Sequence, residues 1–226
     1  MKTIVIVPAK AQSERLPGKN TLRVGSHTLV EHAIAAAKGV GLVVVASDSE
    51  AILRRACDFA SLASIEAVPH VLGAELVGKR VPMEDVIEDV IRARPADRYV
   101  LLQPTSPLRR RRHVASALAI LERTGCDSVL SVHEVTKEVY FSGTLDRDGR
   151  FTSGRPPNVR MFTNDLPKLV TENGAVYAWT HDHWRKTHSR MGGDCRAMEM
   201  LPEDAIDIDT PAELERAQRW FGGEVT

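Results

Sequence analysis

Asp207 and Asp209 are the residues of this chain best placed to do chemistry, because they are both carboxylates and stand two positions apart. In an extended segment side chains alternate, so both are expected on the same side. Two carboxylates held that close repel each other unless one takes up a proton or a cation lies between them. Mg²⁺ prefers such a site, with one or two carboxylates plus substrate phosphates. On these residues alone, carboxylates that serve the dipole of a following helix are an equally good interpretation.

The residues that follow the pair indicate where a helix begins. Thr210 is a good N-cap, Pro211 suits the first helical position, and Glu213 would complete a capping box. The apolar residues before the pair predict a short strand over Ala205–Ile208. The two carboxylates are therefore expected at the end of a strand, facing whatever binds there.

Alternating apolar runs and helical patterns indicate the fold class. Strands are predicted over Thr3–Val7, Gly41–Ala46, Tyr99–Leu102, Ser128–Val132, Thr171–Trp179 and Ala205–Ile208. Helices are predicted around Val30–Ala37, after a Thr28/Glu31 capping box, over Ile52–Ala60 and Asp85–Ala93, and around Val114–Leu121. This alternation predicts an α/β fold, a mostly parallel sheet with helices on both faces.

Residues 133–170, here called the excursion, interrupt this rhythm. Turn-forming residues are frequent there, including Gly143, Gly149 and Gly154, and no helical period survives. The run Asp146–Gly149 predicts a hairpin. We expect the excursion to leave the sheet and return to it within one domain that spans residues 1–226.

Composition limits the setting in which the chain works. Lys plus Arg and Asp plus Glu are 30 each, so the net charge gives no support to nucleic-acid binding. The cysteines, Cys57, Cys126 and Cys195, are far apart and form no metal-binding pair, which predicts reduced thiols and a cytoplasmic protein. No apolar run reaches membrane-spanning length, so no association with a membrane is expected.

A basic loop follows the first predicted strand. It carries Lys10, Arg15 and Lys19, with Ser13 and Asn20 as neutral hydrogen-bonding partners. Ligands of open α/β sheets bind beyond the carboxyl ends of the strands, and cations there suit a triphosphate. The loop matches neither the P-loop nor the GxGxxG pattern. The alternative is a solvated basic loop with no ligand.

Four motifs together resemble one family. The loop Val7-Pro8-Ala9-Lys10-x-x-Ser13-x-Arg15-Leu16-Pro17-Gly18-Lys19-Asn20 is similar to the signature loop of the cytidylyltransferases that activate acidic sugars, such as the CMP-sialic acid synthetases. The other three motifs are Leu101–Arg109, Glu172–Tyr177 and Asp207–Thr210, in the family's order. On these motifs the chain is identified as a member of that family.

The resemblance implies a Rossmann-like domain that binds CTP and Mg²⁺ and transfers CMP to an acidic acceptor of the nonulosonic or sialic type, with release of pyrophosphate. It implies that the nucleotide is held by Lys10, Ser13, Arg15, Lys19 and Asn20. The acceptor would be faced by Gln103, Asn173 and Tyr177, and the metal would be held by Asp207 and Asp209. Lys19, Arg15 and Asp209 would carry catalysis, and the excursion would form a homodimer.

The chain departs from the family pattern at several positions. Gln12, Glu14 and Leu72 stand where the family usually has Gly, Lys and Arg, and Lys79-Arg80 replaces an Asp-Thr pair. Arg80 is therefore expected to take over a phosphate contact. These departures leave the acceptor open and keep a small phosphonate acceptor as an alternative. A glycosyltransferase and a catalytically inactive nucleotide-binding protein are further alternatives.

A run of arginines, Arg109–Arg112, opens a predicted helix, where positive charge opposes the helix dipole. No aromatic platform accompanies the run. We therefore expect a solvated face, with Arg109 reaching the site, rather than a nucleic-acid interface.

Overall fold

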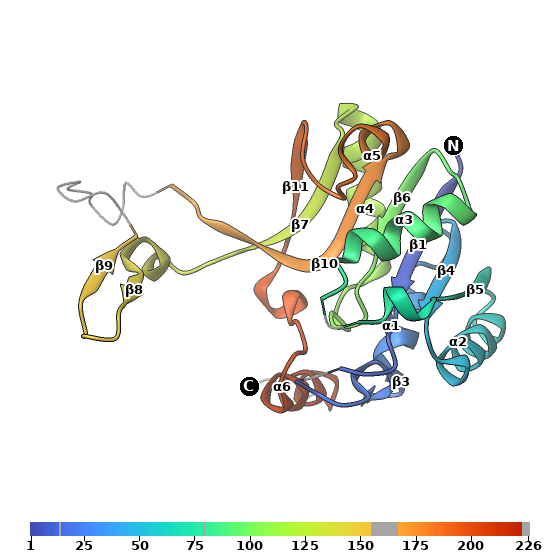
Figure 1. The fold of residues 1–226 in the computed structure, drawn as a ribbon, viewed down its shortest axis with the longest axis horizontal. Helices are drawn as coiled ribbons and strands as arrows, with labels where there is room; N and C mark the ends of the chain where they lie inside the picture. Colours follow the sequence, from blue (N-terminus) through green and yellow to red (C-terminus); the bar gives the residue numbers. More distant parts are fainter. Residues whose placement is uncertain (14, 79, 155–166, 223–226) are drawn as a thin grey trace.

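A seven-stranded sheet forms the centre of the computed structural model, which describes residues 1–13, 15–78, 80–154 and 167–222 (Figure 1). Its strand order is β11-β7-β10-β6-β1-β4-β5. The strands are β1 (Thr3–Pro8), β4 (Leu42–Ser47), β5 (Ala67–Val71), β6 (Arg98–Leu101), β7 (Ser128–Glu134), β10 (Val170–Thr180) and β11 (Cys195–Met200). β10 is antiparallel to both of its neighbours, whereas the other pairings in this sheet are parallel.

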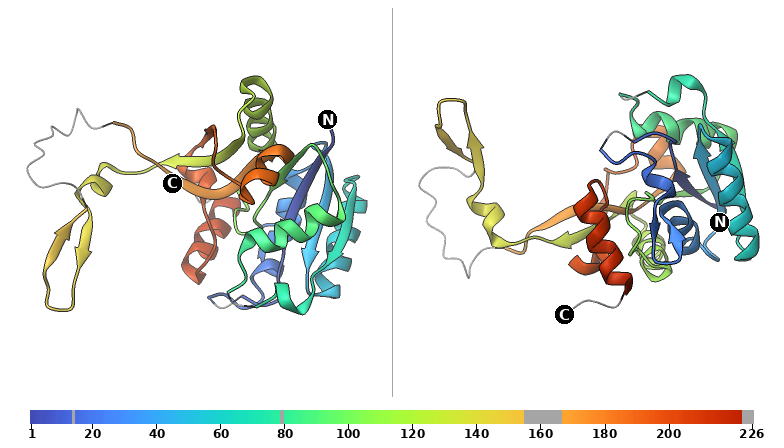
Figure 2. Two further views of the ribbon diagram at one scale, coloured as in Figure 1. Left: turned by 45° about the horizontal axis from the view of Figure 1, so that its top comes forward. Right: turned by 90° about the horizontal axis from the view of Figure 1, so that it is seen from below.

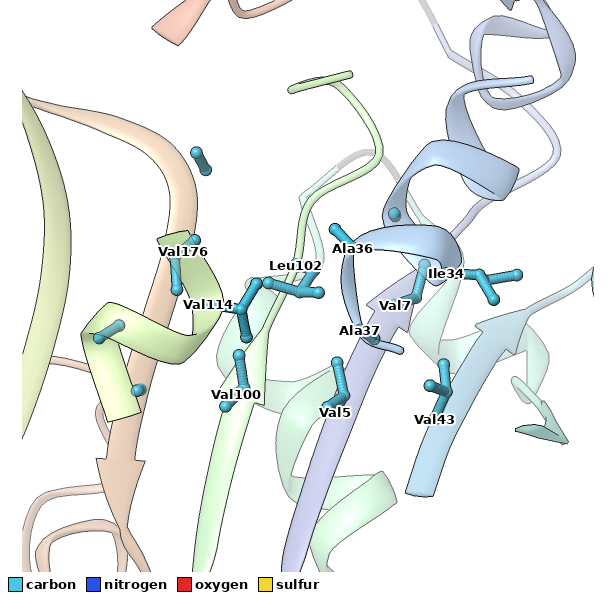
Figure 3. Packing of buried hydrophobic residues seen from close by; sticks show 14 of the residues in the cluster. Val5, Val7, Ile34, Ala36, Ala37, Val43, Val100, Leu102, Val114 and Val176 are labelled. Atoms are coloured by element: carbon cyan, nitrogen blue, oxygen red, sulfur yellow. The ribbon is translucent and has the colours of Figure 1, made fainter. Parts of the chain in front are cut away.

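Helices cover both faces of this sheet, as the sequence predicts. α1 (Leu29–Ala36), α2 (Glu50–Leu62) and α4 (Arg111–Thr124) share one apolar core with the strands. Figure 3 shows Ile34 and Val114 from this layer against strand residues such as Val5. α3 (Met83–Ala93) and α5 (His181–Thr187) close the other face over a second core. Every residue of β1 is buried, because β1 has strands on both sides and helices on both faces.

Two helix starts have the capping boxes expected from the sequence. The backbone N–H of Thr28 donates to Glu31, and that of Glu31 donates back to the Thr28 hydroxyl. α6 (Pro211–Gly222) begins in the same way, since the N–H of Thr210 donates to the Glu213 carboxylate at 2.8 Å. The start of α6 is therefore satisfied by residues of its own first turn.

The predicted strand over Ala205–Ile208 is wrong. Pro202–Ala205 form a 3₁₀ helix (η5), and the segment after it is extended but joins no strand. Ile206 and Ile208 are buried in a small apolar cluster with Leu108, so side-chain packing rather than a sheet ladder holds them. The last strand is instead β11, which the sequence did not suggest because polar residues interrupt it.

The excursion leaves the body of the molecule between β7 and β10 (Figure 2). Its described part holds a 3₁₀ helix, η3 (Lys137–Phe141), and the predicted hairpin, formed by β8 (Gly143–Leu145) and β9 (Phe151–Ser153). Smaller elements near the first loop are η1 (Lys19–Thr21), β2 (Arg23–Val24), β3 (His27–Thr28) and η2 (Ala74–Leu76). In the part of the chain that the structure describes, none of the helices has the length and apolar character needed to cross a bilayer.

Glu31 provides a test of how the first helix is anchored. Burial opposes its charge, but hydrogen bonds from Thr28 and Arg55 outweigh burial and hold the pKa below its usual 4.5. Because the pKa is lower in the folded chain, the carboxylate adds stability above pH 4.5, and this is lost as the pH falls through the folded value. We expect Glu31→Gln to lower the free energy of unfolding by about 1–2 kcal/mol at pH 7.

Urea titrations followed by circular dichroism at pH 7 and pH 3 measure this effect. The difference between Glu31→Gln and the unmodified chain should shrink at the lower pH. Glu66→Gln, at an exposed position, is the matched control and should change little at either pH. An equal loss for Glu31→Gln at both pH values would contradict the prediction.

Candidate active site

A recess of about 390 Å³ lies beyond the carboxyl ends of β1 and β6. Polar and charged side chains line it from three parts of the chain: Lys10, Gln12, Ser13, Arg15, Lys19, Asn20, Gln103, Thr105, Asp207 and Asp209. A second recess of about 660 Å³ shares the residues of the first loop and continues toward Asp48 and Gly78. The basic loop and the aspartate pair, which the sequence singled out separately, therefore meet in one place.

Contacts with the end of β4 hold the first loop in shape. The Ser47 hydroxyl donates to the carbonyl of Ala9 at 2.6 Å, and the N–H of Ala11 donates to the Asp48 carboxylate at 2.7 Å. The side-chain amide of Asn20 donates to the carbonyl of Lys10 at 2.8 Å. Asn20 thus lines the recess and supports the loop backbone. The role of Asp48 was not predicted from the sequence, although its position just after a predicted strand could have indicated it.

The Asp209 carboxylate is shared between two cations of the first loop. Nζ of Lys19 lies 2.8 Å from its Oδ1, and Nη2 of Arg15 lies 2.8 Å from its Oδ2. The Lys19 side chain is only 12% exposed, whereas that of Arg15 is 68% exposed. The Lys19 pair is therefore less screened by water and fixes the loop to the Asp209 segment more firmly than Arg15 does.

Asp207 lines the same recess as Asp209, as their spacing predicts. Although the residue as a whole is exposed, partial shielding of its carboxyl raises its pKa, and the charge of Asp209 acts in the same direction. A hydrogen bond with the Thr105 side chain and the charge of Lys19 oppose this rise. Asp207 takes part in no ion pair within the described residues, so a cation placed there would offset a charge that the protein leaves uncompensated.

These residues fit a magnesium ion that is bound together with a substrate. Among the residues that the structure describes, no group of three or more His, Cys, Asp or Glu side chains could hold a metal alone. Proteins bind Mg²⁺ through one or two carboxylates and complete its shell with phosphates and water. Two carboxylates at the wall of a recess with three cationic side chains match that donor set.

The three residues predicted to face an acceptor have different environments. Gln103 lines the recess, and its side-chain oxygen lies so close to Gly174 that a Cβ there would be 2.7 Å away. Asn173 is buried behind it, accepts from the Ser131 hydroxyl, and its side-chain NH₂ has no partner among the described residues. Tyr177 is buried in the second core, where its hydroxyl donates to Glu172. Of the three, only Gln103 lines this recess.

The residues at which the chain departs from the family pattern also lie in different surroundings. Leu72 is buried and forms an apolar wall of the recess with Met83 and Val86. Gln12 is exposed and lines both recesses. Arg80 is exposed and lines neither, and Glu14 and Lys79 lie outside the described residues. The apolar wall was missed because Val86 was taken for a core residue of the predicted helix Asp85–Ala93, and Met83 lies before the predicted start of that helix.

The arginine run is not a solvated face throughout. Arg109 is buried, and its Nη1 donates to the carbonyls of Gln103 at 2.8 Å and Ala175 at 3.0 Å. Burial lowers the pKa of Arg109 to about 9. It does not line the 390 Å³ recess but joins the loop after β6 to β10 behind it, so the expectation that it reaches the site is corrected to a supporting role.

Comparison with known proteins gives a consistent result. Residues 4–143 match the model of a family described as Cytidylyltransferase. The N-acylneuraminate cytidylyltransferase of Streptococcus agalactiae serotype V is 28% identical over 216 residues, which cover 93% of this chain and 51% of that protein. The chain thus spans about half the length of this relative.

Two further proteins match over most of their length. The CMP-N,N'-diacetyllegionaminic acid synthase of Legionella pneumophila is 28% identical over 226 residues, 94% of this chain and 93% of that protein. The solved structure of a CMP:2-keto-3-deoxy-manno-octonic acid synthetase complexed with CTP superposes with a TM-score of 0.69 at 20% identity, covering 100% of both chains. At that identity the superposition supports the fold alone.

Arg109 gives a test of the support behind the recess. Lysine keeps the charge, but its single ammonium on a different stem does not reproduce the planar group whose Nη1 donates to both carbonyls. We expect Arg109→Lys to lower the free energy of unfolding by about 1.5–3 kcal/mol, measured by urea denaturation. Arg123→Lys, at an exposed position in α4, should change it by less than about 0.5 kcal/mol. Equal effects of the two substitutions would show that the buried guanidinium contributes nothing.

Proposed function

We propose that this chain, which belongs to the cytidylyltransferase family, transfers CMP from CTP to an acidic sugar of the nonulosonic or 2-keto acid type and releases pyrophosphate. The names of the matched relatives support this acceptor class, since they act on N-acylneuraminate and form the CMP derivative of diacetyllegionaminic acid. An acceptor oxygen attacks the α-phosphorus of CTP. The new O–P bond forms as the bond to the β-phosphate oxygen breaks, and the hydroxyl proton is released.

The observation that carries this proposal is the convergence of three cations and two carboxylates on one recess. Lys10, Arg15 and Lys19 neutralise the triphosphate and the leaving pyrophosphate, where negative charge develops during the reaction. The negative charge of a free triphosphate has to be offset, and this cationic loop can do so. The loop lies at the carboxyl end of β1, where α/β sheets bind ligands.

The ion pairs of Asp209 give the loop a way to respond to its substrate. Both carboxylate oxygens of Asp209 are engaged by Lys19 and Arg15. A bound triphosphate competes for these two cations, because phosphate oxygens accept charge-assisted hydrogen bonds as carboxylates do. As the phosphates engage the cations, Asp209 becomes available to a divalent ion.

We assign Mg²⁺ to Asp207 and Asp209, with the remaining positions filled by phosphate oxygens and water. When bound, Mg²⁺ orients the phosphates and offsets the charge that develops on them. The chain's own residues do the rest: Lys19, Arg15 and Lys10 bind phosphate oxygens, and Ser13 adds a neutral hydrogen bond. The carbonyl of Thr105 accepts a hydrogen bond from the N–H of Ile208 at 2.8 Å and so holds the segment between the two aspartates.

The two ends of the recess suit the two substrates. The apolar wall of Leu72, Met83 and Val86 offers a surface for the face of the nucleobase. Gln103, on the other side, is placed to hydrogen-bond the acceptor. Asn173 supports Gln103 from behind, and its side-chain NH₂ is a donor without a partner among the described residues, whereas Tyr177 stays in the core.

The excursion is proposed to pair with a second copy of the chain. Its described part exposes large apolar side chains, of which Leu145 is 71% and Phe151 is 59% exposed. An isolated two-stranded hairpin is at best marginally stable in water, and within the described ranges β8 and β9 pair only with each other. A second copy that covers this hairpin would supply the missing apolar contacts, and it would make a homodimer.

We expect Phe151→Glu to shift the chain to a monomer, because a charge would be buried in the proposed interface. Sedimentation velocity measures the mass in solution. Thr152→Glu is the matched control, since successive residues of a strand face opposite sides and Thr152 lies on the other side from Phe151. A monomeric unmodified chain, or an equal effect of the two substitutions, would contradict the proposal.

We place the protein in the cytoplasm, where nucleoside triphosphates are available. Cys57, Cys126 and Cys195 are free thiols, which agrees with a reducing compartment. We propose neither a nucleic-acid nor a membrane partner, because the recess that carries the function suits small anionic substrates.

The proposed activity is tested by pyrophosphate release from CTP and Mg²⁺ with a panel of acceptors: N-acetylneuraminate, 3-deoxy-manno-octulosonate and a small phosphonate. Mass spectrometry identifies the CMP conjugate, and ATP, GTP and UTP replace CTP in parallel. We expect turnover with CTP and a sugar acid. Turnover of the phosphonate alone would overturn the acceptor class, and binding of CTP without turnover of any acceptor would indicate an inactive nucleotide-binding protein.

The aspartate pair is tested by Asp207→Asn and Asp209→Asn. Removing a residue that only supports a metal ligand already lowers metal affinity or activity roughly 10–100-fold. We therefore expect each substitution of a direct ligand to lower kcat/KM by at least about 100-fold. Asp182→Asn, at an exposed position in α5 that does not line the recess, is the control and should keep full activity. Near-normal rates for both site variants at saturating Mg²⁺ would remove the metal assignment.

A further inference from the structure

We infer that Asp204 is a positioning residue: it anchors residues 206–209, here called the carboxylate segment, to the start of α4 and so sets where Asp207 and Asp209 stand. This inference rests on the proposed function for its catalytic consequence. The anchoring itself concerns the free protein and can be tested without turnover.

Asp204 is an unusual carboxylate because it is only 2% exposed while it lies at the end of a short 3₁₀ helix. Its Oδ2 accepts a hydrogen bond from Nη2 of Arg112 at 2.5 Å and lies 3.4 Å from Nε2 of His113. Nη2 of Arg110 is 3.7 Å from the other oxygen. Three residues at the start of α4 therefore surround one buried carboxylate.

The geometry of His113 fits this arrangement. Its Nδ1 accepts a hydrogen bond from the backbone N–H of Arg110, and its Nε2, which lies near Asp204, is 3.1 Å from Nε of Arg112. The first of these hydrogen bonds caps α4, since His113 reaches back to the N-cap residue. The His113 ring is thus fixed to the helix end and holds Arg112 beside the carboxylate.

A second connection joins the two segments beyond Asp204. The N–H of Ile208 donates to the carbonyl of Thr105 at 2.8 Å, and Thr105 and Asp207 line the same recess. Thr105 belongs to the loop that leads from β6 into α4. The carboxylate segment is therefore fixed at Asp204 and again at Ile208, and both attachments lead to the same loop and helix start.

Both connections act on a segment that the sheet does not hold. The carboxylate segment joins no strand of the sheet, so it lacks the ladder that fixes β1 and β6. Breaking a buried charged pair by removing one partner is costly, because the other charges stay without compensation. Replacing the Asp204 carboxylate would leave Arg110 and Arg112 without their acidic partner and would release the segment at its first attachment.

The experiment uses Asp204→Asn in the full chain, with Glu203→Gln as the matched control, because Glu203 is its exposed neighbour in the same short helix. Hydrogen–deuterium exchange, read by mass spectrometry on the free protein, follows the peptide that contains residues 205–210. We expect its exchange to become roughly tenfold faster in Asp204→Asn, with the strands β1 and β6 unchanged.

Steady-state kinetics then measure the consequence for catalysis. We expect Asp204→Asn to lower kcat on the order of a hundredfold, as misplacement of a catalytic group by about 1 Å can do. The KM for CTP should change much less, since the apolar wall and the first loop are untouched. Asp204→Glu keeps the charge and should recover part of the loss. Glu203→Gln should behave as the unmodified chain in both experiments.

Several results would overturn the inference. Exchange that accelerates evenly across the chain, or that does not change at residues 205–210, would mean that Asp204 does not anchor this segment. If Asp204→Asn fails to fold, Arg112→Gln replaces it, with Arg123→Gln as control, and the same local effect on exchange is required. A chain that shows the exchange effect but no turnover with any acceptor would instead contradict the proposed function.

Discussion

The ion pairs between Asp209 and the cations of the first loop are the interaction on which the rest of the site depends. Lys19 and Asp209 are 190 positions apart in the sequence and lie in direct contact. They can meet only because β1 is central in the sheet, with its carboxyl end next to that of β6, and because the chain returns to this edge after its last strand. The contact also sets the charge balance of the recess, because both oxygens of Asp209 are paired with cations, whereas Asp207 takes part in no ion pair within the described residues.

Around this contact the protein buries charges that need close partners. Arg109 donates to two backbone carbonyls behind Gln103, and Asp204 is surrounded by Arg112, Arg110 and His113. Such groups are costly to take out of water, so each fixes the elements that it joins. Both act on the loop and helix start that follow β6. The arginine run, which looks like a surface feature in the sequence, therefore orders the backbone on both sides of the recess.

Much of the fold could be predicted from the sequence because the relevant signals are local. Continuous apolar runs marked the buried strands, and the residues Thr28 and Glu31 marked a helix start that the structure confirms. The prediction failed where packing outweighs the local pattern. Ile206 and Ile208 resemble a strand but pack in an apolar cluster, β11 is interrupted by polar residues, and the antiparallel direction of β10 follows from its return out of the excursion.

The sequence by itself determined which residue types could do the chemistry. These are a basic loop after the first strand and two carboxylates, two positions apart, just before the N-cap of the last helix. Local patterns and side-chain chemistry suffice for that. Only the tertiary structure decided which of them share one recess, that Arg109 and Asn20 act as supports, and that Tyr177 lies in the core. The physical reason is that burial and pairing of charges depend on neighbours brought together from distant parts of the chain, and no local pattern records them.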